Sequence, residues 1–273
     1  MNFKHYIKRI KDFYTISDNF GYFLNFIFMH FYFYLKRRFS FMPNFKIKLK
    51  CKKIIDNKLN KFFVYITDNS DSSVLNEIFV QDEYNFDINR NPRIIFDIGA
   101  NVGFSTIYFK LKYPNSKIYS FEPDKNTFDK LLKNTSQFQD IICVNAAISN
   151  VTGFEKFYPY PGSSMSSSLI KRINEQDSII VKSYSIVDFL NENKIDFVDL
   201  IKFDVEGSEF KIFQSNEILN KIGNLFGEVH LDIMGKKLDD FLNLFNNYSS
   251  YVKEISKERR YIVHLYNNKI KNL

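Results

Sequence analysis

The 273-residue sequence predicts an α/β domain with a mainly parallel sheet, preceded by a smaller accessory segment. Three observations support this fold class. After Pro92, short apolar runs alternate with helical patterns, these runs are continuous, and 45% of the residues are hydrophobic. Continuous apolar strands separated by helices are typical of a parallel sheet covered on both faces. The chain is long enough for one such core and an appendage.

Residues 1–45 form a basic, aromatic segment in which a helix is expected. The stretch 20–35 holds 13 apolar residues in 16, fewer than the roughly 20 that a transmembrane helix needs. Basic residues flank it on both sides, and no signal-peptide cleavage site follows. Two interpretations stay open: peripheral membrane contact through residues 20–38, or a helix buried against the main domain or a second subunit of a homo-oligomer.

The positive charge is concentrated at the beginning of the chain. The segment 1–61 holds 14 Lys or Arg and 3 Asp or Glu, a net of +11, which leaves −4 for the remainder. A domain that binds nucleic acid should carry its excess charge where it meets the phosphates, so no nucleic-acid partner is expected. Cys51 and Cys143 lack metal-ligand or disulfide spacing, which favours a cytoplasmic protein, with the inner face of the membrane left open.

Residues 46–91 are expected to form an accessory unit of strands and a helix. From Phe45 to Ile66 polar and apolar residues alternate, which predicts an antiparallel pair of strands. Asp71 to Tyr84 follows as a helix, and Asn91-Pro92 marks a boundary. The sequence therefore predicts three parts, which are residues 1–45, 46–91 and 92–273.

The main domain alternates strands and helices in sequence order. Seven strands are expected, at Ile94–Ile98, Lys117–Phe121, Ile141–Val144, Ile179–Tyr184, Val198–Phe203, Leu225–Ile233 and Tyr261–Leu265. Helices are expected at Ser105–Leu111, Lys125–Asn134, Val187–Asn191 and from Ser208. An irregular insertion from Val151 to about Ser178 contains a serine-rich part, Gly162–Leu169, which is either a flexible loop or a substrate lid.

The first main-domain strand runs into a loop of small residues that suits a nucleotide-like ligand. Its sequence from Asp97 to Gly103 is Asp-Ile-Gly-Ala-Asn-Val-Gly. Small residues allow a tight turn, and the N–H groups at the start of the following helix face a ligand. Asn101 stands where the dinucleotide fingerprint needs its second glycine, which counts against a dehydrogenase. The carboxylate of Asp97 suits the cationic methionine part of S-adenosylmethionine (SAM) better than a pyrophosphate.

A second acid supports the same cofactor. Glu122, in Phe121-Glu122-Pro123, stands at the end of the strand that follows the glycine loop and its helix. A carboxylate at that position can accept hydrogen bonds from both ribose hydroxyls. The two motifs together predict SAM binding.

Several segments resemble the FkbM-type methyltransferases between about Leu75 and His230. They are Asp97–Gly103, Phe121–Pro123, Asn145-Ala-Ala-Ile-Ser149, Leu200-Ile-Lys-Phe-Asp-Val-Glu-Gly-Ser-Glu209 and Gly227-Glu-Val-His230. The resemblance implies a Rossmann-like class I methyltransferase with a mainly parallel seven-stranded sheet, helices on both faces, and SAM-dependent O-methylation. The expected cofactor contacts are Asp97, Gly99, Ala100, Asn101, Gly103, Phe104, Ser105, Glu122, Pro123, Asn145, Ala146 and Asp204.

Three residues are candidates for catalysis. Asp204 follows the strand Val198–Phe203 and should point into the crevice where open α/β sheets bind ligands. Glu206 lies close behind it, and His230 ends a later strand, where a neutral imidazole would accept the substrate proton. Glu209 is divided between a structural and a functional role, because acids favour a first helical turn. These types also bind divalent cations, but the spacing matches no recognised ligand set, so no metal is assigned.

The leading hypothesis is an O-methyltransferase that acts on a sugar hydroxyl of a glycan or glycoconjugate in polysaccharide biosynthesis. The chain lacks the Pro-Pro-aromatic and Pro-Cys motifs of nucleic-acid methyltransferases. A non-catalytic SAM-binding or membrane-docked interaction protein is the alternative from another class. The presence of Asp204, Glu206 and His230 together favours an active enzyme.

Overall fold

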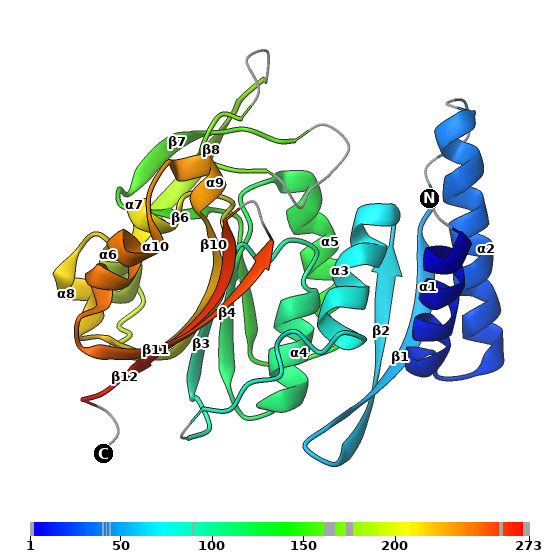
Figure 1. Cartoon of the computed structure of the whole chain (residues 1–273), viewed down its shortest axis with the longest axis horizontal. Helices are drawn as coiled ribbons and strands as arrows, with labels where there is room; N and C mark the ends of the chain where they lie inside the picture. The colour runs from blue at the N-terminus through cyan, green and yellow to red at the C-terminus, as the bar shows by residue number, and fades with distance from the viewer. Residues whose placement is uncertain are drawn as a thin grey trace. The chain divides into compact units, whose positions relative to one another are not determined.

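The structure of the chain is a computed structural model (Figure 1). It describes residues 3–39, 41, 43, 45–88, 90–160, 167–172, 177–256 and 259–269, and for a few helical residues the backbone alone. The chain divides into two compact units. Unit 1 contains residues 1–86, 102–114 and 132–139, and unit 2 contains residues 87–101, 115–131 and 140–273.

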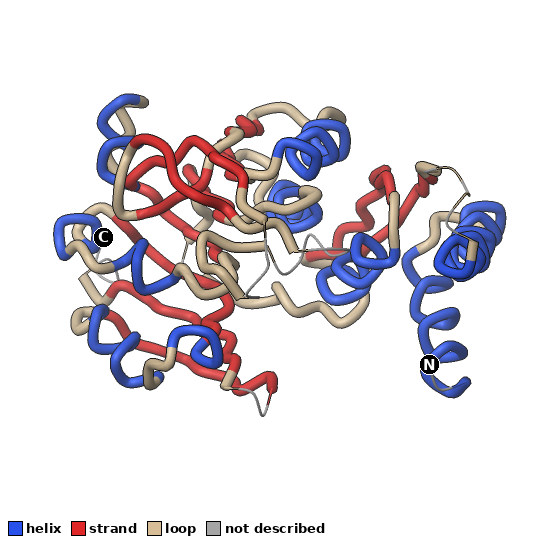
Figure 2. The backbone as a smooth tube through the Cα atoms, turned by 90° about the horizontal axis from the view of Figure 1, so that it is seen from above, coloured by secondary structure: helices blue, strands red, loops and turns tan. Residues whose placement is uncertain are grey.

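Unit 1 combines helices with one β-hairpin, as Figure 2 shows. Its elements are α1 (Phe3–Ile16), α2 (Phe20–Arg38), β1 (Ile47–Ile55), β2 (Lys58–Ile66), α3 (Asn69–Phe79) and α4 (Phe104–Lys112). The two strands pair antiparallel and are joined by Asp56 and Asn57, which both have positive φ. Such residues favour the two-residue turn whose twist matches the strands. The expected strand pair is confirmed, whereas the helix predicted from Asp71 to Tyr84 ends at Phe79.

Helix α2 has one buried and one exposed apolar face. Its buried side chains pack against α1 and β1 in the same unit, where Phe26 stacks on Phe13 of α1. The buried members are Phe23, Phe26, Met29, His30 and Phe33, and the exposed ones are Phe20, Leu24, Phe28, Phe31 and Tyr34. Among the described residues, no helix has the length and apolar character needed to cross a membrane.

Unit 2 contains a seven-stranded sheet in the order β11-β12-β10-β9-β3-β4-β5. The strands are β3 (Ile94–Ile98), β4 (Lys117–Phe121), β5 (Ile141–Val144), β9 (Val198–Phe203), β10 (Ile222–His230), β11 (Tyr248–Ser256) and β12 (Arg260–Asn267). The first five are parallel to one another, β12 pairs antiparallel with β10, and β11 pairs antiparallel with β12. The chain starts at β3, builds outward to β5, and then returns to the other side of β3 with β9. The mainly parallel α/β fold class is thereby confirmed.

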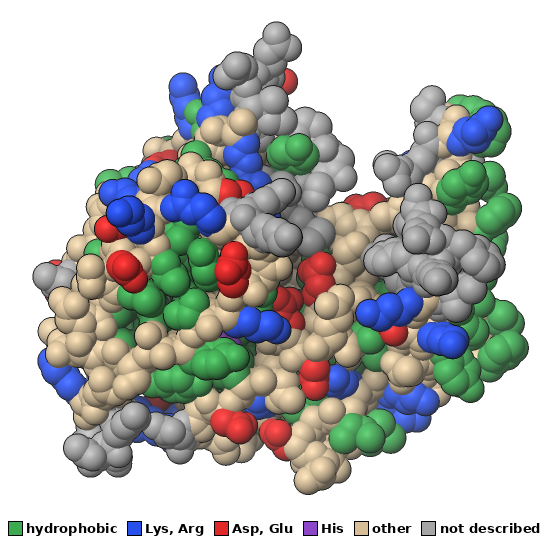
Figure 3. All heavy atoms as spheres, viewed as in Figure 1, with side chains coloured by type: hydrophobic (Ala, Val, Ile, Leu, Met, Phe, Trp, Pro, Cys, Tyr) green, Lys and Arg blue, Asp and Glu red, His purple; other side chains and the backbone are tan. Residues whose placement is uncertain are grey.

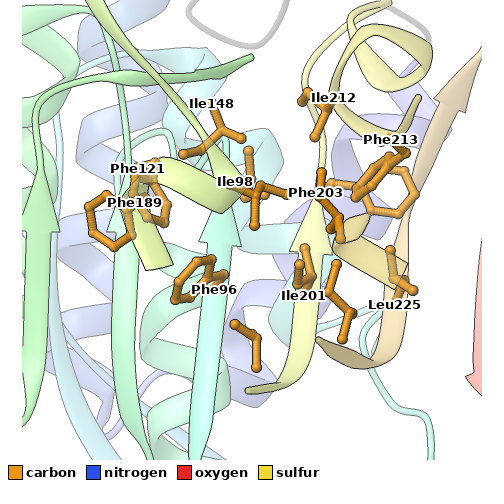
Figure 4. Packing of buried hydrophobic residues seen from close by; sticks show 14 of the residues in the cluster. Phe96, Ile98, Phe121, Ile148, Phe189, Ile201, Phe203, Ile212, Phe213 and Leu225 are labelled. Carbon is orange, nitrogen blue, oxygen red and sulfur yellow. The ribbon is translucent and has the colours of Figure 1, made fainter. Parts of the chain in front are cut away.

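Short helices bury one face of this sheet. They are α6 (Ile186–Glu192), α7 (Glu209–Phe213), α8 (Asn216–Leu219), α9 (Leu231–Met234), α10 (Leu238–Leu242) and η2 (Asn243–Phe245), while α5 (Lys125–Thr135) connects β4 to β5. In Figure 4, Phe189 of α6 lies against Phe96 and Phe121, and Phe213 of α7 lies against Phe203. The burial of these aromatic side chains stabilises the packing of the helices on the sheet.

Two strand predictions were wrong in sheet membership or extent. The strand predicted at Ile179–Tyr184 does form, as β8 (Ile179–Ser185), but it pairs with β6 (Ala147–Ser149) and β7 (Gly153–Phe157) in a separate sheet. Its place among the seven is taken by β11, which was not predicted. The insertion from Val151 is therefore partly regular. The strand predicted to end at Ile233 ends at His230, where α9 begins.

Candidate functional site

The loop after β3 makes a close backbone contact with the end of β9. Gly99 has φ +73°, and a Cβ built on it would lie 2.0 Å from the carbonyl oxygen of Asp204. No side chain fits there, and an L residue would also be strained by the positive φ. The predicted cofactor loop and Asp204 are thus adjacent. A glycine is required at position 99 by the packing of the chain as well as by the approach of a ligand.

Asp97 lies beneath this loop, beside a lysine that was not among the predicted site residues. The Asp97 side chain is fully buried, and its Oδ1 lies 3.3 Å from Nζ of Lys202 on β9. The same Nζ donates a hydrogen bond of 2.8 Å to the carbonyl oxygen of Gly99. Lys202 therefore joins β9 to the end of β3 and to the first residue of the turn. Its identity as a buried ion-pair partner follows from the parallel pairing of β3 with β9, which its own neighbours in sequence do not reveal.

Glu122 is fixed by backbone N–H groups at the end of β4. Asn101 donates to its Oε2 at 3.1 Å, and Asp124 donates to its Oε1 at 2.9 Å. Burial raises the pKa of the Glu122 carboxyl to about 8, although both hydrogen bonds favour the charged form. Asn145 braces the turn, since its Nδ2 donates to the carbonyl oxygens of Glu122 and Pro123 at 2.9 and 3.0 Å. The predicted residues Asn101, Glu122, Pro123 and Asn145 therefore meet.

The remaining predicted cofactor contacts in the loop and after β5 are buried, as Asp97 is. Ala100 and Ala146 are buried, and Ala146 belongs to the hydrophobic cluster of unit 2. The N–H of Ala100 donates to the carbonyl oxygen of Phe121, which fixes the turn. Gly103, with φ +91°, begins α4 and falls with Phe104 and Ser105 in unit 1.

The three predicted catalytic residues lie together at the carboxyl ends of β9 and β10. Asp204 follows β9 directly, and His230 is the last residue of β10. Nε2 of His230 lies 3.2 Å from Oε2 of Glu206. Glu206 has φ +54°, a left-handed conformation that turns the chain toward α7. Local backbone strain of this kind is common at functional sites.

Glu209 holds the imidazole of His230. Its Oε1 lies 2.8 Å from Nδ1 of His230 and also accepts from the N–H of Gly207, and both side chains are fully buried. Desolvation lowers the pKa of His230, but the hydrogen bond to Glu209 and the carboxylates of Glu206 and Asp204 outweigh it and raise this pKa to about 9. His230 is then protonated at neutral pH, which weakens the predicted role of a neutral base.

Two further charged residues complete the cluster and were not predicted. Glu228, two residues before His230 on β10, has its Oε1 3.5 Å from His230 Nε2. Arg172 pairs with the Glu206 carboxylate and also donates to its carbonyl oxygen at 3.0 Å. The alternation of side chains along a strand could have indicated Glu228, because it shares the face of His230. Arg172 lies in the insertion, where no pattern pointed to it.

The insertion reaches this cluster through its described end. Ser168 donates to the carbonyl oxygen of Glu206 at 2.7 Å. Of the serine-rich part predicted as a loop or lid, residues 162–166 lie outside the described residues. The contact of Ser168 and Arg172 with Glu206 brings the end of the insertion to the candidate site.

The side chains around the loop suit the hydrogen-bonding groups of SAM. Oδ1 of Asn101 and Oδ1 of Asp204 are buried and accept no hydrogen bond from the described residues. Such acceptors are costly unless a ligand donor satisfies them. An α-ammonium group and ribose hydroxyls supply donors of this kind. The unpartnered acceptors of the site therefore match the hydrogen-bond donors of the predicted cofactor.

The position of the site agrees with a general rule for open α/β sheets. Ligands bind outside the carboxyl ends of the strands, where the strand order reverses, which here is between β3 and β9. The family model described as "Methyltransferase FkbM domain" matches residues 97–252, more than half of the chain. The chain belongs to the FkbM methyltransferase family. This confirms the predicted family, the Rossmann-like class I fold and SAM as the cofactor.

Two characterised relatives carry names that describe sugar or hydroxyl chemistry. The chain is 22% identical over 152 residues to the hexuronic acid methyltransferase AglP of Haloferax volcanii, covering 55% of this chain and 61% of AglP. It is 25% identical over 151 residues to the 2-O-methyltransferase NoeI of Sinorhizobium fredii, covering 50% and 62%. The chain thus matches less than two thirds of the length of either relative.

A solved structure of the same family is also similar. It is the methyltransferase FkbM from Methylobacillus flagellatus, with 14% identity and a TM-score of 0.44, covering 64% of this chain and 44% of that one.

Proposed function

We propose that the chain is a SAM-dependent O-methyltransferase that acts on a saccharide hydroxyl. The observation that carries the proposal is the backbone contact between Gly99 and Asp204, which brings the cofactor loop against the main chain of a residue whose carboxylate Oδ1 has no hydrogen-bond partner among the described residues. A methyl donor and an acceptor hydroxyl have to be aligned in line, and this contact keeps their two binding regions adjacent. The saccharide class rests on the name of AglP, and the transfer to oxygen is supported by the name of NoeI.

SAM supplies an electrophilic methyl group when it is bound. The chain itself has to bind the acceptor and handle the hydroxyl proton, because an alcohol is a poor nucleophile. Asp204 is the proposed partner of the hydroxyl, since it is half-buried at the carboxyl end of β9. Glu122 is proposed to accept hydrogen bonds from the ribose hydroxyls. The buried ion pair of Asp97 and Lys202 supports the turn that begins at Gly99.

The test compares two aspartates at opposite ends of the same strand. Asp204→Asn should leave SAM affinity within about tenfold and lower methyl transfer by about a hundredfold or more, the usual size of an acid/base contribution. Asp196→Asn, at the exposed amino end of β9, is the matched control and should change neither quantity. Normal turnover of Asp204→Asn would assign this residue to structure.

The acceptor class is tested by transfer of radiolabelled methyl from SAM to glycan, lipid and nucleic-acid fractions of the source cells. Label in the glycan or glycolipid fraction is the expected result. Label confined to nucleic acid would overturn the saccharide class, and an absence of transfer with normal SAM binding would favour the non-catalytic alternative.

We further propose that α2 attaches the protein to an anionic membrane surface. Five exposed apolar side chains recur at helical spacing along its outer face, and Figure 3 shows this stripe at the right-hand side of the view. Exposed apolar stripes of this size mark interaction sites. The net charge of +11 over the segment 1–61 complements anionic lipid and opposes a second copy of the same surface. The charge therefore favours lipid over a homodimer.

Vesicle sedimentation of the full chain tests this attachment. Phe28→Ser with Phe31→Ser should reduce binding to vesicles containing anionic phosphatidylglycerol at least about tenfold, because both anchors are removed. Phe154→Ser with Ile180→Ser, two exposed apolar residues of unit 2, is the matched control and should bind like the wild type. If the wild type ignores the vesicles at low salt and the α2 variant converts a dimer to a monomer, the stripe is a subunit interface instead.

A further inference from the structure

Three potential ligand atoms converge beside the proposed acceptor position. The side chains of Asp204, Glu228 and His230 each offer one ligand atom, and these atoms lie within 4.8 Å of one another. The parallel pairing of β9 and β10 places Gly227 opposite Phe203, the last residue of β9. Glu228 and His230, the next residues of β10 on one face, therefore lie beside Asp204, which follows β9. Two carboxylates and one imidazole form a donor set suited to a divalent cation. We propose that these three residues bind one.

The orientation of His230 supports this site independently of the acidic side chains. A histidine that binds a metal usually donates its other ring N–H to a carboxylate, which fixes the tautomer and aims the free nitrogen at the ion. Glu209 supplies such a carboxylate at Nδ1, 2.8 Å away. The remaining nitrogen, Nε2, belongs to a fully buried side chain and makes no hydrogen bond with the described residues. It faces the carboxylates of Glu206 and Glu228 at 3.2 and 3.5 Å, and a cation that binds there displaces the proton that these carboxylates favour on the imidazole.

The charges around this point favour a cation as well. Four carboxylates gather there, from Asp204, Glu206, Glu209 and Glu228. Arg172 compensates Glu206, and Arg260 is paired with Asp232. Oδ1 of Asp204 is buried without a hydrogen-bond partner among the described residues. Buried acids of this kind are stabilised when they are paired or coordinate a metal.

The cation would activate the acceptor hydroxyl beside Asp204 in the proposed O-methyl transfer. This role of the cation rests on the proposed function. A divalent cation held at Asp204 lowers the pKa of a hydroxyl that binds to it. The hydroxyl proton passes to the carboxylate of Glu206. The oxygen then forms a bond to the methyl carbon as the bond between that carbon and the sulfur of SAM breaks, leaving S-adenosylhomocysteine.

Metal binding is measured directly, without SAM or acceptor. The full chain is treated with a chelator, dialysed and titrated with Mn²⁺ under electron paramagnetic resonance, and in parallel with Zn²⁺ by calorimetry. One ion per chain is expected for at least one of the two metals. Glu228→Gln should weaken its binding at least about tenfold, and Glu209→Gln should weaken it by about 10–100-fold through the orientation of His230.

Glu217→Gln is the matched control, because Glu217 is exposed on α8, away from the cluster. Its affinity should equal that of the wild type. Circular dichroism checks that each variant is folded, and the partly exposed side chain of Glu228 makes its substitution the milder one. Binding of neither metal, or equal affinity in the wild type and Glu228→Gln, would overturn the site. Equal methyl-transfer rates of the metal-free and metal-bound proteins would overturn only the activating role of the cation. A wild-type chain that does not bind SAM would count against the proposed function instead.

Discussion

Gly99→Ala is the substitution whose effect follows most directly from the geometry. The new Cβ would lie 2.0 Å from the Asp204 carbonyl oxygen, and contacts below 3.0 Å do not persist in proteins. The backbone of β3 or β9 therefore has to shift to make room for it. Overpacking of this kind costs about 1–3 kcal/mol, and the left-handed φ of +73° adds about 1–2 kcal/mol. The free energy of unfolding should fall by about 2–5 kcal/mol in total.

Comparison with Gly235→Ala isolates the packing part of this loss. Gly235 also has a left-handed φ, +62°, but a Cβ there meets no atom within 4 Å. Only the conformational cost of about 1–2 kcal/mol applies, and the smaller entropy of the unfolded alanine chain is common to both variants. Urea unfolding of the two variants measures the difference. If their free energies of unfolding agree within the error of the measurement, the close contact between Gly99 and Asp204 is refuted.

Two further substitutions test the buried charges beneath and beside the loop. Lys202→Met should lower the free energy of unfolding by about 3–5 kcal/mol, because Asp97 loses an ion-pair partner at a fully buried position; in urea unfolding, adding Asp97→Asn should restore part of that loss, and no restoration would contradict the pairing. The raised pKa of Glu122, about 8, means that the folded state binds more protons than the unfolded state from about pH 4.5 upward, so the stability from this group is lost as pH rises toward 8. Without added cofactor, the wild type should therefore lose stability relative to Glu122→Gln between pH 5 and pH 8, and a constant difference across that range would contradict this assignment.

The parts of the fold that the sequence predicted are those with strong local patterns. The apolar runs of β3, β4 and β9 identified central parallel strands, and each strand is followed directly by a candidate site residue. β11 was missed because it lies at the edge of the sheet with most of its side chains exposed or half-buried, so it lacks a clear apolar face. The sheet to which β8 belongs depends on its partners, since an apolar stretch carries no record of which strand it will pair with.

The candidate site shows the same division between local and distant information. Glu122 and Asp204 could be placed because each follows a recognisable strand. The pairing of Lys202 with Asp97 and of Glu209 with His230 could not, because these partners meet only after the sheet has formed. Arg172 was inaccessible for a further reason: it lies in an insertion without periodicity and acts through a loop carbonyl and a carboxylate that are far away in sequence.

The contacts at the switch point connect the cofactor loop to the acidic cluster. The N–H of Asn101 donates a hydrogen bond to Glu122 on one side of the loop. On the other side, Gly99 contacts the backbone carbonyl of Asp204, and Lys202 donates a hydrogen bond to the carbonyl of Gly99. A displacement of any of these groups therefore moves the others. Residues in contact commonly show coupling energies of about 0.5–3 kcal/mol. Substitutions in the loop and at Asp204 should consequently be non-additive in SAM affinity.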